Sequence, residues 1–162
     1  MKLLGANRQK QAKARKQARQ IRERILKHCQ GATRAESGKS MGLGPNDIAN
    51  LRAGNGVSLI MIVRLIEKGK FTPTSILGGK SLRKLPRGTS TRSVRTEQIT
   101  KRIRKIAMAG APQEIAKKTG LAAVTVYQFR TKPPETVSLQ TILCFMDAGY
   151  SADFLLLGKG NP

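Results

Sequence analysis

The feature that most limits how this chain can fold is an internal repeat. The segment VSLIMIVRLIEKG at residues 57–69 corresponds to VSLQTILCFMDAG at residues 137–149, at an offset of 80 in the numbering. Earlier in each copy an offset of 78 aligns Ile21 with Ile99, Ile25 with Ile103, Thr33 with Ala111, Glu36 with Glu114, Gly42 with Gly120, Leu43 with Leu121, and Ile48 with Val126. Each copy is as long as a small helical domain, so the repeat predicts two copies of one helical unit.

The chain is strongly basic, and its charge is uneven. It has 31 Lys and Arg against 9 Asp and Glu, which gives a formal charge of +22 over 162 residues. Residues 1–29 carry ten Lys or Arg and one acid, and residues 68–96 carry eight and none. Such a chain is expected to bind a polyanion, and counterion release favours nucleic acid. The alternative is that both runs are merely solvated charge.

Composition argues against several other classes of protein. The sequence lacks the ~18 consecutive apolar residues of a membrane-spanning helix and the apolar run of a signal peptide, so a cytoplasmic, nucleoid location without a membrane partner is expected. Two cysteines, Cys29 and Cys144, and one histidine are too few for a zinc site, and both thiols are expected to be buried or half-buried. The absence of clustered acid, base or nucleophile groups predicts no enzyme activity, no cofactor and no small-molecule ligand. The aromatic content of 4% disfavours single-strand binding by base stacking.

The same patterns predict four segments along the chain. A basic helical N-terminal arm at 1–20, rich in Gln, Ala, Lys and Arg, continues into the first domain at 21–78. A basic linker at 79–96 mixes Gly, Ser, Thr, Pro and Arg without an apolar period, and the second domain occupies 97–160.

The stretch EIAKKTGLAAVTVYQFRT at residues 114–131 predicts a corner between two short helices. Gly120 ends the first helix in the left-handed conformation, and Leu121 closes the corner from inside. Val126 and Phe129 then face the core. The outward residues of the second helix are Ala123, Val124, Tyr127 and Gln128, followed by Arg130, Thr131 and Lys132. An ordinary helical bundle has similar corners and is the alternative interpretation.

The first copy carries a weaker version of this corner. Gly38 takes the place of Ala116 inside the first helix, where it costs about 1 kcal/mol relative to Ala. Thr33 and Glu36 form a predicted capping box at the start of that helix. The predicted outward residues are Asn46, Asn50 and Arg52.

The spacing of Ala116, Gly120 and Val126 resembles the helix-turn-helix of the Cro/C1-type regulators, the lambda-repressor-like or XRE family. The segment VSLQTILCFMDAGYSADFLLLGKG at residues 137–160 is similar to the two closing helices of that family. The corner and the closing segment stay in register with the family pattern over most of the second copy. The resemblance implies an all-α fold, with two lambda-repressor-like helix-turn-helix bundles joined by a basic linker and preceded by the basic arm.

The resemblance also implies roles for individual residues, because in this family the second corner helix enters the major groove. Implied base contacts are Asn46, Asn50, Ala123, Val124, Tyr127 and Gln128. Expected backbone contacts are Thr33, Arg34, Arg52, Gln113, Arg130 and Lys132, with Arg15, Arg19, Arg22, Arg83, Lys84 and Arg87 from the basic segments. Asn and Gln suit bidentate pairing with adenine, whereas the Ala-Ala-Val start of the second corner offers methyl contacts of the kind thymine accepts.

The implied function is that of a sequence-specific transcriptional regulator that binds double-stranded DNA through two tandem heads. Half-sites lie ~34 Å apart, and a joint of about 17 residues reaches roughly 55 Å at ~3.3 Å per residue, so one chain is expected to bind an asymmetric or two-half-site operator. RNA polymerase and a second copy of the chain, as a homodimer, are further expected partners. The alternatives are a nucleoid-associated or RNA-binding protein that acts through its basic arms, and an antitoxin-like interaction protein.

Overall fold

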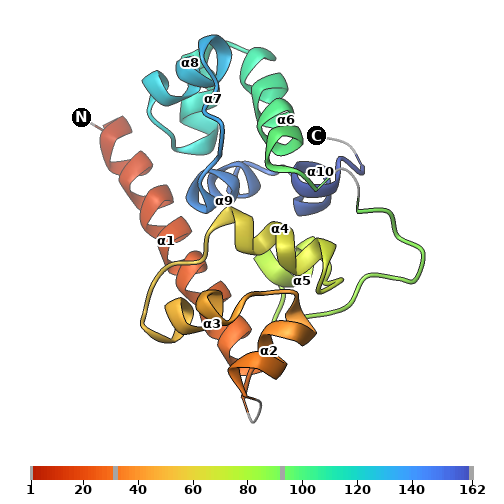
Figure 1. Cartoon of the computed structure of the whole chain (residues 1–162). Helices are drawn as coiled ribbons and strands as arrows, with labels where there is room; N and C mark the ends of the chain where they lie inside the picture. Colours follow the sequence, from red (N-terminus) through yellow and green to blue (C-terminus); the bar gives the residue numbers. More distant parts are fainter. Residues whose placement is uncertain (1, 31–32, 92–93, 161–162) are drawn as a thin grey trace.

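The computed structural model describes residues 2–30, 33–91 and 94–160, except for the side chains of residues 2–6 and Arg34. This part of the chain is all-α, with ten helices and no β-strand (Figure 1). The long first helix is α1 (Lys2–His28). The first copy of the repeat continues with α2 (Arg34–Met41), α3 (Pro45–Arg52), α4 (Leu59–Glu67) and α5 (Pro73–Leu77). The second copy contains α6 (Thr96–Met108), α7 (Pro112–Thr119), α8 (Ala123–Thr131), α9 (Leu139–Asp147) and α10 (Ala152–Leu157).

The helix starts follow the offsets of the sequence repeat. The offset of 78 separates the start of α2 from that of α7 and the start of α3 from that of α8, and the offset of 80 separates the starts of α4 and α9. Helix α1 is longer than its counterpart α6, because α6 begins at Thr96, which corresponds to Ala18. Residues 2–17 of α1 therefore precede the part of this helix that corresponds to α6.

Local capping explains where the two corners begin and turn. The backbone N–H of Thr33 donates to the Glu36 carboxylate at 2.9 Å, and the Thr33 hydroxyl accepts from the Glu36 N–H at 3.3 Å, which confirms the capping box. The Thr33 hydroxyl also donates to the Glu36 carboxylate at 2.8 Å, and the two bonds that this carboxylate accepts, from the Thr33 N–H and hydroxyl, hold the pKa of Glu36 below its usual value. Gly42 (φ 70°) and Gly120 (φ 77°) end α2 and α7 in the left-handed conformation, as the sequence predicts.

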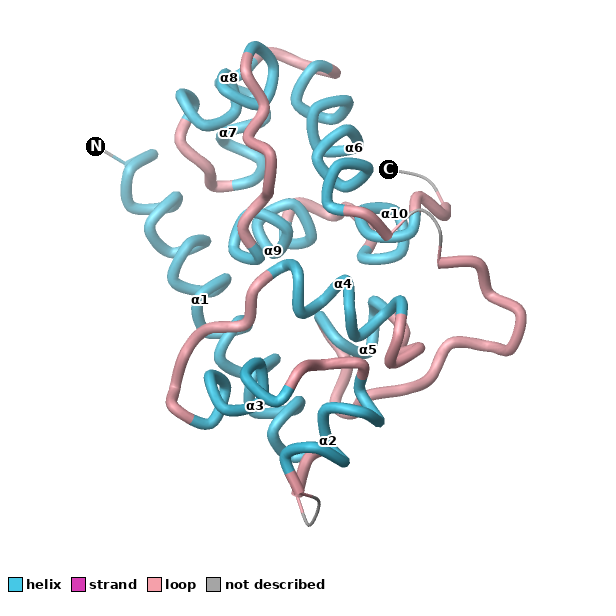
Figure 2. The backbone as a smooth tube through the Cα atoms, viewed as in Figure 1, coloured by secondary structure: helices cyan, strands magenta, loops and turns pink. Residues whose placement is uncertain are grey.

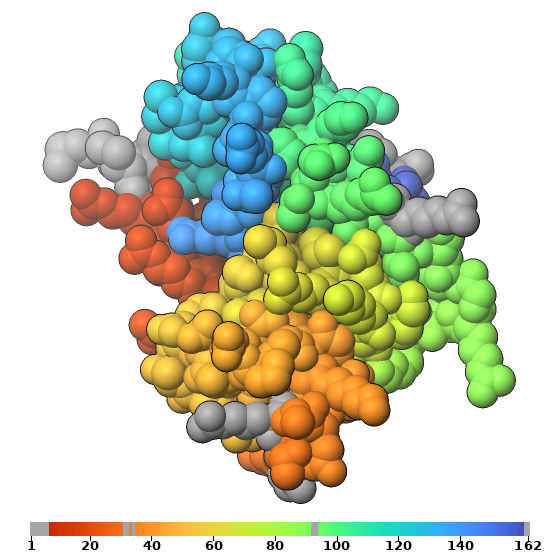
Figure 3. All heavy atoms as spheres, viewed as in Figure 1, coloured from red at the N-terminus to blue at the C-terminus, as the bar shows by residue number. Residues whose placement is uncertain are grey.

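The two copies pack against each other through pairs of equivalent contacts. Helix α1 packs on α9, and its counterpart α6 packs on α4. Helix α5 packs on its own counterpart, α10. This pattern is that of an approximate two-fold arrangement within one chain, and a single hydrophobic cluster contains side chains from both copies. Figure 3 shows the copies in direct contact on the face drawn.

Helix α1 runs alongside both copies and contacts α3 and α5 of the first as well as α7 and α9 of the second (Figure 2). Near its start, Lys10 donates to the carbonyl of Lys118 at 2.7 Å, at the end of α7. Ala14 is 2% exposed on the inner face of α1, and the adjacent Lys13 pairs with Asp147 of α9. The N-terminal basic segment is therefore a packed part of the fold.

The segment between the copies is held at its first half by the first copy. Backbone bonds join Thr72 to Arg83 at 2.8 Å and Leu85 to Lys70 at 2.5 Å, while the N–H of Arg83 donates to the Ser75 hydroxyl at 2.9 Å. The loop that follows projects from the body of the molecule (Figure 1). In the part of the chain that the structure describes, no helix combines the length and the apolar character needed to cross a bilayer.

Candidate nucleic-acid interface

The α8 outer face consists of Ala123, Val124, Tyr127 and Gln128, which are all exposed. Val124 is 62% exposed and Tyr127 56%. The opposite side of the helix is anchored by Val126 (0% exposed) and Phe129 (3%). Because these two side chains hold α8 on the core, the outer face takes no part in packing and is available to a partner.

The α3 outer face consists of Asn46 and Asn50, which are also exposed. Ile48 and Leu51 anchor α3 on the core, each 0% exposed. Asp47 fixes the start of the helix, since its carboxylate accepts from the Gly44 N–H at 2.9 Å and from Arg64 of α4 at 2.7 Å. At the offset of 78, Asn46 corresponds to Val124 and Asn50 to Gln128.

Each outer face belongs to a corner whose turn is closely packed. In the second corner, Leu121 is 7% exposed and the Thr119 hydroxyl accepts from its N–H at 3.3 Å. Lys10 of α1 packs over Gly120, where an added Cβ would lie 2.6 Å from the Cβ of Lys10. In the first corner, an added Cβ at Gly42 would lie 2.3 Å from the Cβ of Lys68. Both corners are therefore rigid supports for the helices that follow them.

Some of the residues expected to contact a phosphate backbone are occupied within the protein. Arg22 donates to the carbonyl of Gly54 at 2.8 Å, and Arg130 donates to that of Gly110 at 3.3 Å. The ammonium of Lys84 lies 3.9 Å from the centre of the Phe71 ring and donates to the carbonyl of Gly69. Burial lowers the pKa of Lys84 from its usual value.

Other expected backbone contacts are accessible. The exposed residues are Arg15, Arg19, Arg52, Arg83, Arg87, Gln113 and Lys132. The Thr33 side chain is used by the capping box, and the side chain of Arg34 lies outside the described ones. The structure thus leaves exposed cations on the outer side of α1, at the ends of α3 and α8, and in the linker.

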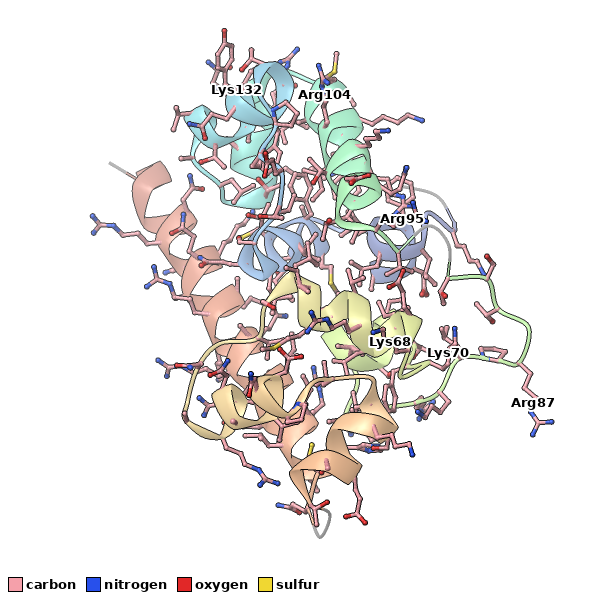
Figure 4. The ribbon with its side chains drawn as sticks, in the orientation of Figure 1. Lys68, Lys70, Arg87, Arg95, Arg104 and Lys132 are labelled. Atoms are coloured by element: carbon pink, nitrogen blue, oxygen red, sulfur yellow. The ribbon has the colours of Figure 1, made fainter. Side chains whose placement is uncertain are left out.

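The structure adds exposed cations that the sequence interpretation did not single out. Among them are Lys68, Lys70, Arg95 and Arg104. Figure 4 shows them together with Lys132 and Arg87, spread from the end of the molecule formed by α6 and α8 to the linker loop. Lys68, Lys70 and Arg95 stand in the basic run 68–96, so charge density could have identified them. Arg104 stands in the run KRIRK at residues 101–105, so charge density could have identified it as well.

Comparison with protein-family models, with curated proteins and with solved structures finds no match for this chain. Functional inference therefore depends on the two outer faces and on the charge around them. Chemically, the α3 outer face offers two amides, and the α8 outer face offers one amide, one phenol and aliphatic groups. These groups can form hydrogen bonds and van der Waals contacts with a partner surface.

Proposed function

We propose that this protein is a sequence-specific regulator that binds double-stranded DNA through two helix-turn-helix bundles of the Cro/C1 type. The observation that supports this most is the equivalence of the two corners. At matching positions of the two copies, a short helix follows a glycine turn, buries its inner side and exposes its outer side. This is the arrangement that a helix needs to enter the major groove.

In the proposed complex the α3 and α8 outer faces contact base edges, and the exposed cations contact phosphates. Asn46, Asn50 and Gln128 carry the amides that suit adenine. Phosphate contacts come from the exposed side chains of Arg52 and Lys132, next to the two outer faces. Arg22, Lys84 and Arg130 are left out of this set, because their cationic groups donate to backbone carbonyls inside the protein.

A single chain supplies both of the proposed DNA-binding helices, because its two copies are packed against each other through α5 and α10. The two outer faces differ in sequence, so each is expected to prefer a different half-site. The operator is therefore expected to be asymmetric. Selection from a random duplex library at physiological salt should enrich a motif that lacks two-fold symmetry, and enrichment of a perfect palindrome would contradict the proposal.

A variant of the α8 outer face tests the assignment of the interface itself. Gln128→Ala should remove about 1–3 kcal/mol of discrimination at one base pair of the selected site, with little change in affinity for random DNA. Gln20→Ala, at an exposed position of α1, is the matched control and should change neither affinity. If Gln128→Ala weakened binding to selected and random duplexes equally, Gln128 would not be a base-reading residue.

A second candidate function is sequence-independent binding to nucleic acid, and the outer side of α1 favours it. Apart from Lys13, which pairs with Asp147, the exposed cations among the described side chains of this helix are Arg8, Arg15, Lys16, Arg19 and Lys27. A rigid row of cations can follow a phosphate backbone without reading bases. Strong binding in the same selection without any enriched motif would support this nucleoid or RNA-binding role over the regulator.

A further inference from the structure

The apolar character of the α8 outer face is not needed for the fold. No charged residue occurs between Lys118 and Arg130. Four large hydrophobic side chains are exposed among the described residues, and α8 carries two of them, Val124 at 62% and Tyr127 at 56%. Val126 and Phe129 already anchor α8 on the core of the second copy, so the core does not need Val124 or Tyr127. The exposure of Val124 and Tyr127 therefore indicates a partner that has apolar groups of its own.

The equivalent position in the first copy shows what is particular to α8. Val124 corresponds to Asn46, whereas Gln128 corresponds to Asn50 and keeps an amide. Both positions are exposed in both copies. At the Asn46/Val124 position, therefore, α3 presents a hydrogen-bonding amide and α8 presents two methyl groups. At the Asn50/Gln128 position both helices present an amide.

The surroundings of the α8 outer face specify the electrostatic character of the partner. Lys132 directly follows α8 and is exposed, and Arg104 of α6 lies at the same end of the molecule (Figure 4). The α8 outer face thus presents the apolar groups of Val124 and Tyr127 beside two cations. A complementary partner surface carries negative charge at its edges and apolar groups between those edges. The major groove of DNA has this character where it contains thymine, because the C5-methyl is the apolar group among its base edges.

We propose that Val124 reads the C5-methyl group of a thymine in one of the two half-sites. This inference rests on the proposed DNA-binding function and adds the base chemistry that separates the two heads. Gln128 stands four residues after Val124, one helical turn along the same side of α8, where its amide reaches a neighbouring base pair. The corresponding Asn46 of α3 selects a hydrogen-bonding base edge in the other half-site.

The test removes single methyl groups from the DNA. In a duplex obtained by library selection, each thymine is replaced in turn by deoxyuridine, which pairs identically but lacks the C5-methyl. Affinity of the wild-type protein should fall about fourfold at one or two positions confined to one half-site, the loss expected for one buried methyl. In Val124→Asn, which exchanges the side chain for the type found at the equivalent position of α3, that loss should disappear, with thymine and uracil duplexes bound equally well.

Asn46→Ala is the matched control, since it changes the equivalent position of the other head. It should weaken binding but preserve the fourfold preference for thymine over uracil. Both side chains are exposed, so both variants should keep the wild-type Tm. A Val124→Asn protein with a lowered Tm is replaced by Val124→Ser, whose side chain also lacks a methyl group, with the same expected loss of preference.

Three results would overturn the proposal. They differ in whether they also contradict the proposed DNA-binding function. Uracil duplexes that bind as tightly as thymine duplexes at every position would exclude methyl reading while leaving DNA recognition intact. A thymine preference that persists in Val124→Asn and Val124→Ser would assign the methyl contact to another residue. Failure of the selection to yield any preferred duplex would reject both the DNA-reading function and the methyl contact.

Discussion

At the scale of single residues, Gly38 shows how tightly the first corner is packed. An added Cβ at this position would lie 2.6 Å from the carbonyl oxygen of Leu43, in the turn that leads to α3. Helix propensity alone predicts that Ala would stabilise α2 by about 1 kcal/mol. Because the neighbouring atom is backbone and cannot move aside cheaply, we expect Gly38→Ala to destabilise the protein by about 1–3 kcal/mol instead. Urea denaturation measures the change.

Gly56 provides the control for this substitution. It has no atom within 4 Å of an added Cβ, and its φ lies outside the left-handed range. Gly56→Ala should therefore leave the free energy of unfolding unchanged or raise it by up to about 1 kcal/mol, through the loss of freedom in the unfolded chain. Equal gains from both substitutions would show that the turn yields to the extra methyl.

The corner residues could be predicted because their determinants are local. Gly42 and Gly120 are needed for a left-handed backbone, and Thr33 caps the helix that begins beside it. Lys84 could not be understood in this way. Its partners, the Phe71 ring and the carbonyl of Gly69, come from a separate segment, and its position in a basic linker suggests a solvated charge.

At the scale of helices, α1 is the element whose role the sequence did not reveal. In the N-terminal half of α1 the buried side contains Ala14, a small residue that contributes little to a hydrophobic pattern in the sequence. Its partners in α7 and α9 are separated from it by more than half of the chain. Periodicity describes a helix face within its own segment, so it could identify Ile21 and Ile25 as core residues but not the contact that continues α1 onto the second copy.

This contact can be tested with two alanines of the same helix. Ala14 is 2% exposed, whereas Ala12 is exposed. Ala14→Gln should destabilise the protein by about 1–3 kcal/mol, because the longer side chain overfills the contact with the second copy. Ala12→Gln changes helix propensity by the same amount and should stay within about 0.5 kcal/mol of wild type in the same denaturation assay. Equal stabilities of the two variants would mean that α1 does not rest on the second copy.

At the scale of the whole molecule, the contacts of α1 fix how the two copies are placed. Lys10 meets the second copy at α7 and Arg22 meets the first at Gly54, so the contacts are twelve residues apart, about 18 Å along one continuous helix. The α5–α10 and α4–α6 contacts also join the two copies. The linker composition suggests a flexible joint between the two copies. The contacts of α1 and the packing of α5 on α10 instead hold the copies in one placement.

A fixed placement predicts a strict spacing between half-sites. Inserting five base pairs between them turns one half-site by about half a helical turn relative to the other. We expect this insertion to lower affinity at least tenfold, because the heads cannot rotate to follow it. Fluorescence anisotropy on a series of duplexes with inserted base pairs gives the measurement. Similar affinities across the series would indicate heads that move independently.

The non-identity of the two outer faces has a consequence for how recognition changes over generations. In a symmetric dimer every codon change appears twice, so both halves of the target must change together. Here a codon change at Val124 leaves Asn46 untouched, and a change at Asn46 leaves Val124 untouched. Under the proposed function, such a chain acquires a new target one half at a time, and each step retains the binding supplied by the unaltered half.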